Sequence, residues 1–208
     1  NLAAKLLDAT GDIRAHRNTY ASMNFNFGPT LLMWIARHQP VLLEGLRAAD
    51  RESMARFGRG SAIAQPYHHP ILPLCDDADR ATEIRWGLDL FRRAYARDAE
   101  GIWLSETAVD LPTLESVVDQ GVDFVILAPH QIAEVQALDT KAWTRATESD
   151  AANRAYRIPL PSGREVVAVV YDGATSRAVA FEGLLHDGAR FADRLADAAG
   201  STGLALVA

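Results

Sequence analysis

The order of apolar and polar residues along the chain constrains its fold more than any other feature. Two near-continuous apolar runs, "DFVILAPHQ" at 123–131 and "EVVAVVYDG" at 165–173, each end in polar residues. Between such runs lie stretches in which apolar residues recur every three or four positions, as on one face of a helix. Apolar strands that alternate with helices are typical of a parallel sheet covered on both faces. The sequence therefore predicts an α/β protein, either an open doubly wound sheet or a barrel.

Proline, aspartate and glycine mark the expected helix ends. Pro29 suits the first turn of a helix that ends near His38, and a second helix runs from Pro40 to a stop at Gly58. Asp110 is a natural N-cap for a third helix, which closes just before residue 121. Further helices are expected over residues 79–95 and 178–199, the second with a break at 188.

Short strands are expected over residues 19–23 and 62–65, and the final "LALVA" at 204–208 reads as a sixth strand. The alternation of strands and helices is interrupted over about 133–165. There "YRIPLPSGREVVAVV" predicts a hairpin around Pro161-Ser162-Gly163, an excursion from the sheet. We expect residues 1–208 to form a single domain. The chain starts at Asn1 and ends on an apolar run, so we expect it to be an excised piece, truncated at both ends.

Composition narrows the classes of partner. The formal net charge of −6, with no basic stripe, argues against binding to nucleic acid. A single cysteine, Cys75, excludes an internal disulfide and a cysteine-based zinc site, which fits a cytoplasmic location. No apolar run approaches the roughly 20 residues of a membrane span, and no signal-peptide pattern is present, so no membrane association is expected.

Polar side chains gather where the expected strands end. They are Asn24, Asn26, His68, His69, Glu106, His130 and Asp172. Parallel strands would bring them to one rim, where α/β proteins place their chemistry. Because no phosphate-binding loop, zinc motif or G-x-S-x-G elbow is present, Glu106 is the most plausible centre of chemistry.

Structural interpretations of the same residues stay open. An acid such as Glu106 can complement a helix dipole, and Asp172 before a glycine can be a turn residue or an N-cap. Imidazoles in a proline-rich loop can cap carbonyl groups. Trp103 fits a core position as well as a sugar-stacking platform.

Two stretches taken together, "AIAQPYHHPILPL" and "GIWLSETAVD", resemble glycoside hydrolase family 57, and more closely a bacterial branch of that glycoside hydrolase and deacetylase superfamily. "SMNFNFGPTLL", "VDFVILAPHQ" and "YDGATSRAVAFEGLL" extend the resemblance, in order, from about Tyr20 to Leu185. The resemblance implies an incomplete parallel barrel of seven β/α units. It also implies retaining hydrolysis or 4-α-glucan transfer on α-linked oligo- or polysaccharides, without a metal or other cofactor.

The resemblance assigns roles to particular residues. Glu106 is the nucleophile of a G-x-W-x-x-E pattern with Gly101 and Trp103, and His69 of a Y-x-H-P pattern lines the neighbouring subsite. The other expected substrate contacts are His68, Trp103, His130, Asp172 and Asn26. The chain departs from the family in having Tyr171, where arginine is frequent, before Asp172.

A retaining glycosidase also needs an acid/base carboxyl group about 5–5.5 Å from its nucleophile. The resemblance places that aspartate after the strand matched by "LALVA", beyond Ala208, and a histidine motif on the first strand is missing too. The chain by itself is therefore expected to be inactive.

Two other functions stay open. A metal-dependent polysaccharide deacetylase would use His68, His69, Asp76 and Asp77 around a divalent ion. A non-catalytic carbohydrate-binding barrel would keep the fold without the reaction. The sequence does not indicate an oligomeric state.

Overall fold

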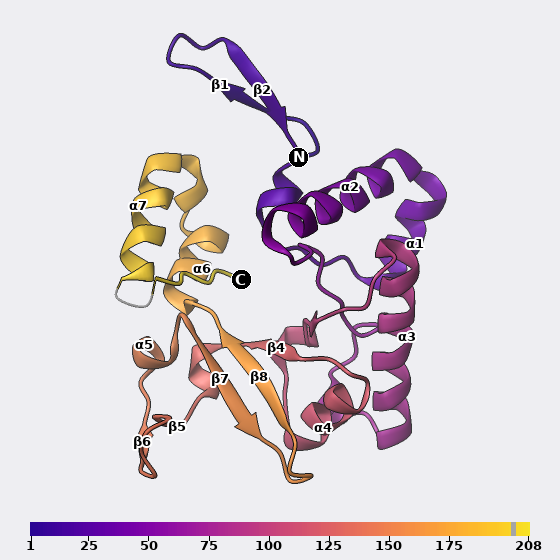
Figure 1. The fold of residues 1–208 in the computed structure, drawn as a ribbon, viewed down its shortest axis with the longest axis vertical. Helices are drawn as coiled ribbons and strands as arrows, with labels where there is room; N and C mark the ends of the chain where they lie inside the picture. Colours follow the sequence, from indigo (N-terminus) through magenta and orange to yellow (C-terminus); the bar gives the residue numbers. More distant parts are fainter. Residues whose placement is uncertain (201–202) are drawn as a thin grey trace. The chain divides into compact units, whose positions relative to one another are not determined.

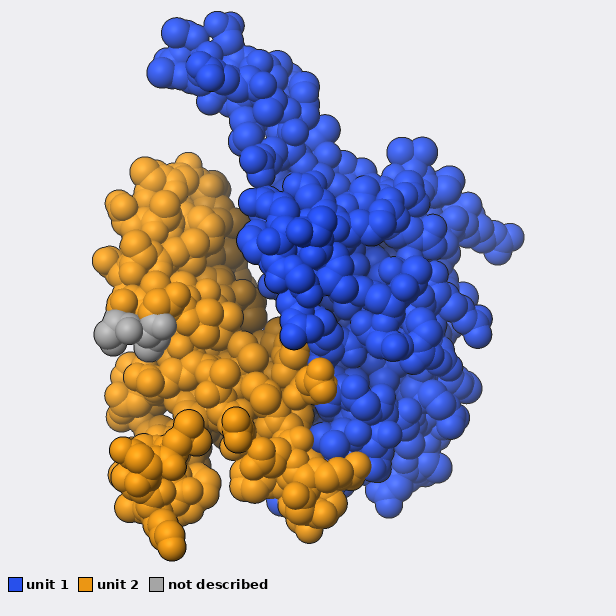
Figure 2. Space-filling model, in the orientation of Figure 1, with its two compact units in different colours: residues 1–122 blue, residues 123–208 orange. Residues whose placement is uncertain are grey.

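The computed structural model describes residues 1–200 and 203–208 as two compact units, residues 1–122 and 123–208 (Figure 2). The elements of the first unit are β1 Ala4–Leu7, β2 Ile13–Arg17, η1 Thr19–Ser22, α1 Pro29–His38, α2 Pro40–Phe57, η2 Leu72–Leu74, α3 Asp77–Tyr95, β3 Gly101–Ile102, η3 Ser105–Thr107 and α4 Leu111–Asp119 (Figure 1). Those of the second are β4 Phe124–Leu127, η4 Pro129–Gln131, β5 Glu134–Gln136, β6 Trp143–Arg145, α5 Glu148–Ala151, β7 Arg154–Pro159, β8 Glu165–Val170, α6 Gly173–Phe181, η5 Leu184–His186 and α7 Gly188–Ala199. The organisation as a single domain stays a prediction.

Helix ends in the first unit lie where local chemistry predicted them. Pro29 and Pro40 occupy the first turns of α1 and α2, and Gly58 ends α2 with a left-handed φ of 71°. Asp110 caps α4, since its side chain accepts a hydrogen bond from the Thr113 N–H at 2.8 Å. These ends depend on residues a few positions apart, which is why the sequence reveals them.

Three parallel segments run through the first unit. Phe25 bridges Ala62, and Ala64 bridges Ile102, each in parallel orientation. The predicted strand over residues 19–23 is wrong: these residues form η1, because the Asn18 side chain caps that turn, and the extended residue is Phe25. The sequence therefore predicted the order of the parallel segments correctly, but it placed the first segment a few residues before its position in the structure.

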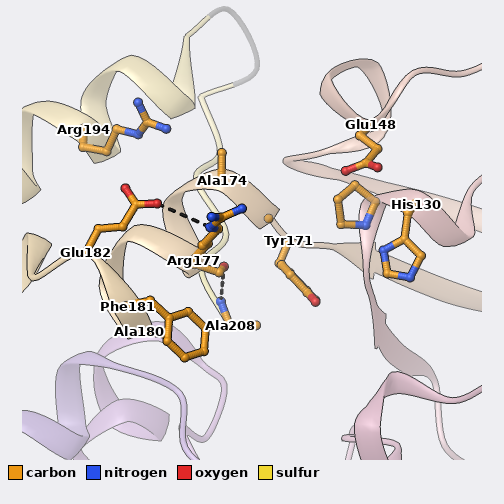
Figure 3. Close-up of a pocket in the computed structure, with 13 residues that line it drawn as sticks. His130, Glu148, Tyr171, Ala174, Arg177, Ala180, Phe181, Glu182, Arg194 and Ala208 are labelled. Atoms are coloured by element: carbon orange, nitrogen blue, oxygen red, sulfur yellow. Dashed lines mark hydrogen bonds and ion pairs between the residues drawn. The ribbon is translucent and has the colours of Figure 1, made fainter.

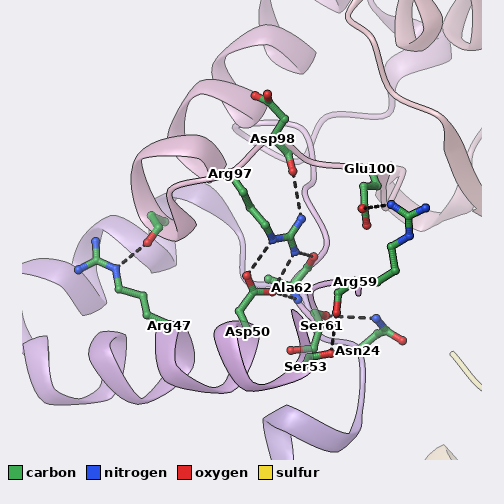
Figure 4. Close-up of polar contacts among 11 residues, drawn as sticks. Asn24, Arg47, Asp50, Ser53, Arg59, Ser61, Ala62, Arg97, Asp98 and Glu100 are labelled. Atoms are coloured by element: carbon green, nitrogen blue, oxygen red, sulfur yellow. Dashed lines mark hydrogen bonds and ion pairs between the residues drawn. The ribbon is translucent and has the colours of Figure 1, made fainter. Parts of the chain in front are cut away.

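A buried ion pair ties these segments to the helices (Figure 4). The Asp50 carboxylate on α2 accepts two hydrogen bonds from Arg97, at 2.8 and 2.9 Å, and a third from the Ala62 N–H at 2.8 Å. The Arg97 guanidinium also donates to the Ala62 carbonyl at 2.9 Å and lies over the Phe91 ring. Asp50 is only 2% exposed, so its charge is compensated entirely by these neighbours.

Apolar side chains of α1, α2 and α3 pack beside this ion pair. Leu32, Ile35, Leu43 and Ala94 form the buried cluster. Tyr95 packs its ring against Phe25 and Phe91, with ring centroids 6.2 and 4.9 Å apart. Burial, together with the Asp50 charge, raises the pKa of Tyr95.

The second unit is built around the parallel pair that the apolar runs predicted. β4 and β8 pair in parallel, with Phe124 opposite Val167 and Leu127 opposite Val170. The other edge of β8 pairs antiparallel with β7, through a turn at residues 160–164. Of the described elements in this unit, β5 and β6 form a separate antiparallel hairpin.

Two sequence predictions in the second unit are corrected. The helical stretch begins at Gly173 and not near 178, because Asp172 caps α6, and its break spans residues 182–187. The segment 204–208 is not a strand. Single hydrogen bonds hold it instead: the Leu206 carbonyl accepts from the Asp172 N–H at 2.8 Å, and the Leu206 N–H donates to Asn153.

Asp50→Asn should destabilise the chain by about 3–5 kcal/mol, because it leaves the Arg97 charge without its buried counter-charge. Urea unfolding followed by circular dichroism measures this loss. The control is Glu44→Gln, which breaks the exposed pair with Arg51 (2.6 Å) and should change stability little. Equal effects of the two variants would contradict the role given to Asp50.

The raised pKa of Tyr95 predicts a loss of stability at alkaline pH. In the unfolded chain this tyrosine ionises near pH 10, whereas the folded chain holds it protonated. The unfolded state therefore releases more protons, and the free energy of unfolding falls as pH rises above about 10. Tyr95→Phe should show a smaller fall than wild type between pH 9 and pH 11 in urea titrations. An equal fall in the free energy of unfolding for both proteins would contradict this role of Tyr95.

Candidate functional site

The loop that carries His69 is held against α3. A Cβ atom at Gly87 would collide with the backbone carbonyl oxygen of Gln65, so only glycine permits this approach. The Tyr67 N–H donates to the Glu83 carbonyl at 3.1 Å, which fixes the loop to the same helix two residues after Gln65. α3 therefore positions the backbone that leads into His68 and His69.

Glu106 lies in a tight turn just after β3. Ile102 and Leu104 are fully buried, and the Trp103 N–H donates to the Ala64 carbonyl at 2.8 Å. Glu106 and Thr107 both have left-handed backbone, with φ of 54° and 53°. This conformation is uncommon for residues other than glycine, and it is an outlier for a β-branched residue such as threonine. Such strain is concentrated at functional sites in proteins.

The structure brings His69 and Glu106 together. The His69 Nε2 atom lies 3.5 Å from the Glu106 Oε1 atom, and its Nδ1 atom lies 3.1 Å from the Gln65 Oε1 atom. Gln65 is 6% exposed, whereas the Glu106 side chain is 77% exposed. A pair this open contributes little to stability. The arrangement is a carboxylate open to solvent beside an imidazole that a buried amide orients.

His68, the neighbouring residue, faces elsewhere. Its Nδ1 atom lies 2.8 Å from one carboxylate oxygen of Glu83, and its N–H donates to the other at 2.8 Å. His69 has a φ of 59°, a left-handed conformation that changes the chain direction after His68. The two histidines grouped by the sequence therefore separate: His69 faces Glu106 and His68 faces α3.

Two other predicted contacts of the first unit are half-buried. Trp103 lies between the buried Ile102 and Leu104, with its backbone bonded to the neighbouring segment. Asn26 follows directly on the parallel bridge of Phe25. The contact of either residue with a substrate stays a prediction.

His130 and Asp172 follow the parallel strands β4 and β8 of the second unit. Asp172 caps α6: its carboxylate accepts from the Thr175 N–H at 3.0 Å and from the Thr175 hydroxyl at 2.7 Å. This is the structural role that the sequence left open for an aspartate before a glycine. His130 is exposed at the edge of an open pocket of about 660 Å³.

Figure 3 shows that pocket from its lining side chains. His130 and Glu148 lie on one side, Arg177 and Glu182 on the other, with Tyr171 between them. Arg177 and Glu182 form an ion pair at 3.4 Å. The lining mixes both signs of charge with aromatic surface.

The four residues considered for a divalent metal each have other partners. Asp76 caps α3, accepting from the Asp79 N–H at 2.8 Å, and Asp77 pairs with Arg80 at 2.7 Å. The histidines contact carboxylates and Gln65, as described above. Over residues 1–200 and 203–208, no three His, Cys, Asp or Glu side chains group as metal ligands would.

Sequence reasoning did not single out several residues that shape the site. Gln65 orients His69, and Glu83 holds His68, yet each acts across a loop whose path only the folded chain defines. A glutamine buried at the end of "AIAQ" is a weak signal for Gln65. Tyr171, just after β8, and Arg177 on α6 line the pocket of the second unit, and of these two residues the sequence pointed only to Tyr171.

Comparisons with known proteins match most of the chain to one family. The family model described as "Glycosyl hydrolase family 57" matches residues 3–202. The chain is 27% identical over 105 residues to a 4-alpha-glucanotransferase of Thermococcus litoralis, and 23% identical over 105 residues to Alpha-amylase 1 of Dictyoglomus thermophilum. Each match covers 50% of this chain and 15% of the relative, so the matched segment is well under a fifth of either protein.

A solved structure shows the same fold. The crystal structure of 4-alpha-glucanotransferase from Thermococcus litoralis matches with a TM-score of 0.66 at 18% identity, covering 90% of this chain and 27% of that chain. The chain thus has the α/β fold of part of a (β/α)7-type barrel, which confirms the fold class predicted from the sequence. Among the described helices, none has the length and apolar character required to cross a bilayer.

Gly87→Ala should destabilise the chain by about 1–3 kcal/mol, since the added methyl group pushes α3 away from the Gln65 backbone. This loss opposes the gain of roughly 1 kcal/mol that alanine brings to a helix interior. The control is Gly188→Ala on α7, where a Cβ meets open space and stability should hold or rise. Thermal unfolding of both variants measures the difference, and a stabilised Gly87→Ala protein would contradict the packing described.

Proposed function

The chain belongs to glycosyl hydrolase family 57, and from that premise we propose that it carries the nucleophile of a retaining enzyme acting on α-linked glucans. Glu106 is that nucleophile. The observation that carries the proposal is the position of its carboxylate, which is 77% exposed in a strained turn after β3, with His69 Nε2 at 3.5 Å. An exposed, oriented carboxylate is what attack on a sugar carbon requires.

The reaction proceeds in two displacements. In the first, a Glu106 oxygen attacks the anomeric carbon, the glycosidic C–O bond breaks, and a separate acid protonates the leaving oxygen. The sugar is then held as an ester of Glu106. In the second displacement, the separate acid has lost its proton and acts as a base. It removes a proton from water or from an acceptor hydroxyl, and the oxygen of that group attacks the anomeric carbon and displaces Glu106 with net retention.

His69 serves the binding of the sugar at this position. Gln65 fixes the Nδ1 side of its ring, so the Nε2 side faces Glu106 and the substrate space. A donor or acceptor at that point can hydrogen-bond a sugar hydroxyl while the ester forms. His130 would contact hydroxyl groups in the same way from the pocket of the second unit.

The acid/base is a different carboxyl group. Asp172 is committed to Thr175 and to the start of α6, which argues against a second role as proton donor. Water as acceptor gives hydrolysis and a sugar hydroxyl gives transfer, matching the two activities in the names of the relatives.

Glu106→Gln should abolish the conversion of maltoheptaose, lowering the rate by at least about a thousandfold, because the amide is a poor nucleophile. The experiment uses the protein at its full natural length and follows oligosaccharide lengths by chromatography. Glu52→Gln is the matched control: it makes the same carboxylate-to-amide change on α2, in an exposed pair with Arg56, and should leave the rate unchanged.

Four outcomes of the maltoheptaose experiment separate the candidate functions. Longer products indicate transfer, and shorter products alone indicate hydrolysis. A Glu106→Gln protein that keeps the wild-type rate would remove Glu106 from the chemistry. Maltoheptaose bound but never converted by wild type would favour a non-catalytic carbohydrate-binding barrel. With azide added, Glu106→Ala should yield a glycosyl azide of inverted configuration, as a retaining mechanism requires.

A further inference from the structure

A second pocket in the first unit lies beside the loop of the two histidines and takes no part in the pair formed by His69 and Glu106. It has a volume of about 520 Å³. Its principal lining residues are Met33, Tyr67, His68, Trp86, Asp89 and Arg93. Residues of α1, α3 and the loop between α2 and η2 therefore build one concave surface, within the size range of small-molecule sites.

Three aromatic rings form its wall. The ring centroid of Tyr67 lies 4.7 Å from that of His68 and 5.8 Å from that of Trp86, both nearly perpendicular. The Tyr67 hydroxyl donates to the Met33 sulfur at 2.9 Å, and Glu83 holds His68 through Nδ1. These contacts fix the rings, yet Trp86 stays 46% exposed. A large indole kept rigid and open to solvent is more than core packing requires.

Polar groups stand beside these rings. Asp89 and Arg93 are one turn apart on α3 and reach the same pocket as Trp86. Asp89 also contacts Arg92 at 3.3 Å, whereas Arg93 has no ion-pair partner among residues 1–200 and 203–208. His68 uses Nδ1 for Glu83, so its other ring nitrogen is directed away from that partner. The pocket combines a flat apolar face with fixed donors and acceptors.

A pyranose ring has the complementary surface: one face of C–H groups, and hydroxyl groups around its edge that both donate and accept. We propose that this pocket, built around Trp86, binds a glucose unit of an α-glucan chain, as a site separate from the pair of His69 and Glu106. The C–H face packs on the Trp86 indole, and Asp89 and Arg93 hydrogen-bond the hydroxyls. This inference rests on the proposed function for its substrate class.

The test measures binding in a protein of full natural length that carries Glu106→Gln, so that no sugar is consumed. Isothermal titration with maltoheptaose gives the affinity, and tryptophan fluorescence reports on the indole. Adding Trp86→Ala should weaken binding about tenfold, because it removes an aromatic contact worth roughly 1.4 kcal/mol. Arg93→Gln should weaken it less. Trp143→Ala, which removes another exposed tryptophan (56%) from β6, is the control and should bind unchanged.

Unchanged affinity in Trp86→Ala would overturn the proposal even if Glu106→Gln is inactive as expected. Should Trp86→Ala fail to fold, by circular dichroism, then Arg93→Gln decides: full affinity in that exposed-helix variant overturns the site. If the wild-type protein never converts maltoheptaose but the Trp86→Ala variant binds it more weakly, the proposed reaction is rejected and this pocket is supported.

Discussion

The ion pair of Asp50 and Arg97 is the constraint on which the first unit depends. The segment around Ala62 lacks a continuous ladder and is bridged at single residues, so its path relies on side-chain hydrogen bonds. The Asp50 carboxylate accepts one from the Ala62 N–H, and the Arg97 guanidinium donates one to the Ala62 carbonyl. Three residues beyond lies Gln65, which orients His69. The buried ion pair thus fixes the segment that leads to Gln65, at a desolvation cost that only complete hydrogen bonding offsets.

Sequence reasoning succeeded where a structure is determined locally. The bounds of α1 and α2, and the cap at Asp110, follow from proline, glycine and aspartate acting over one turn. It failed at residues 19–23, where a cap at Asn18 outweighed an apolar pattern, and at 204–208, where hydrogen bonds to side chains replaced a ladder. The ion pair itself joins residues 47 positions apart and has no local signature.

The same division applies to the site. Strand-end logic and the family resemblance both drew attention to Glu106 and His69, and the fold places them in contact. They could not separate His68 from His69, because the separation depends on a single positive φ at His69. Nor could they identify Glu83 or Gln65, whose partners are defined by how α3 packs on the loop. Residue types were predictable, and orientations were not.

The conformation of the four residues from Leu104 to Thr107 supports the proposal that Glu106 acts in chemistry, because it adds nothing to stability. Two successive non-glycine residues there adopt left-handed backbone, at a cost on the order of 1–3 kcal/mol each. The Ser105 hydroxyl is 1% exposed and has no hydrogen-bond partner among the described residues, which adds a desolvation cost. A glutamate aimed at solvent recovers none of this through packing. The buried neighbours Ile102 and Leu104 hold the strained turn in place, and what the strain achieves is the direction of one carboxylate.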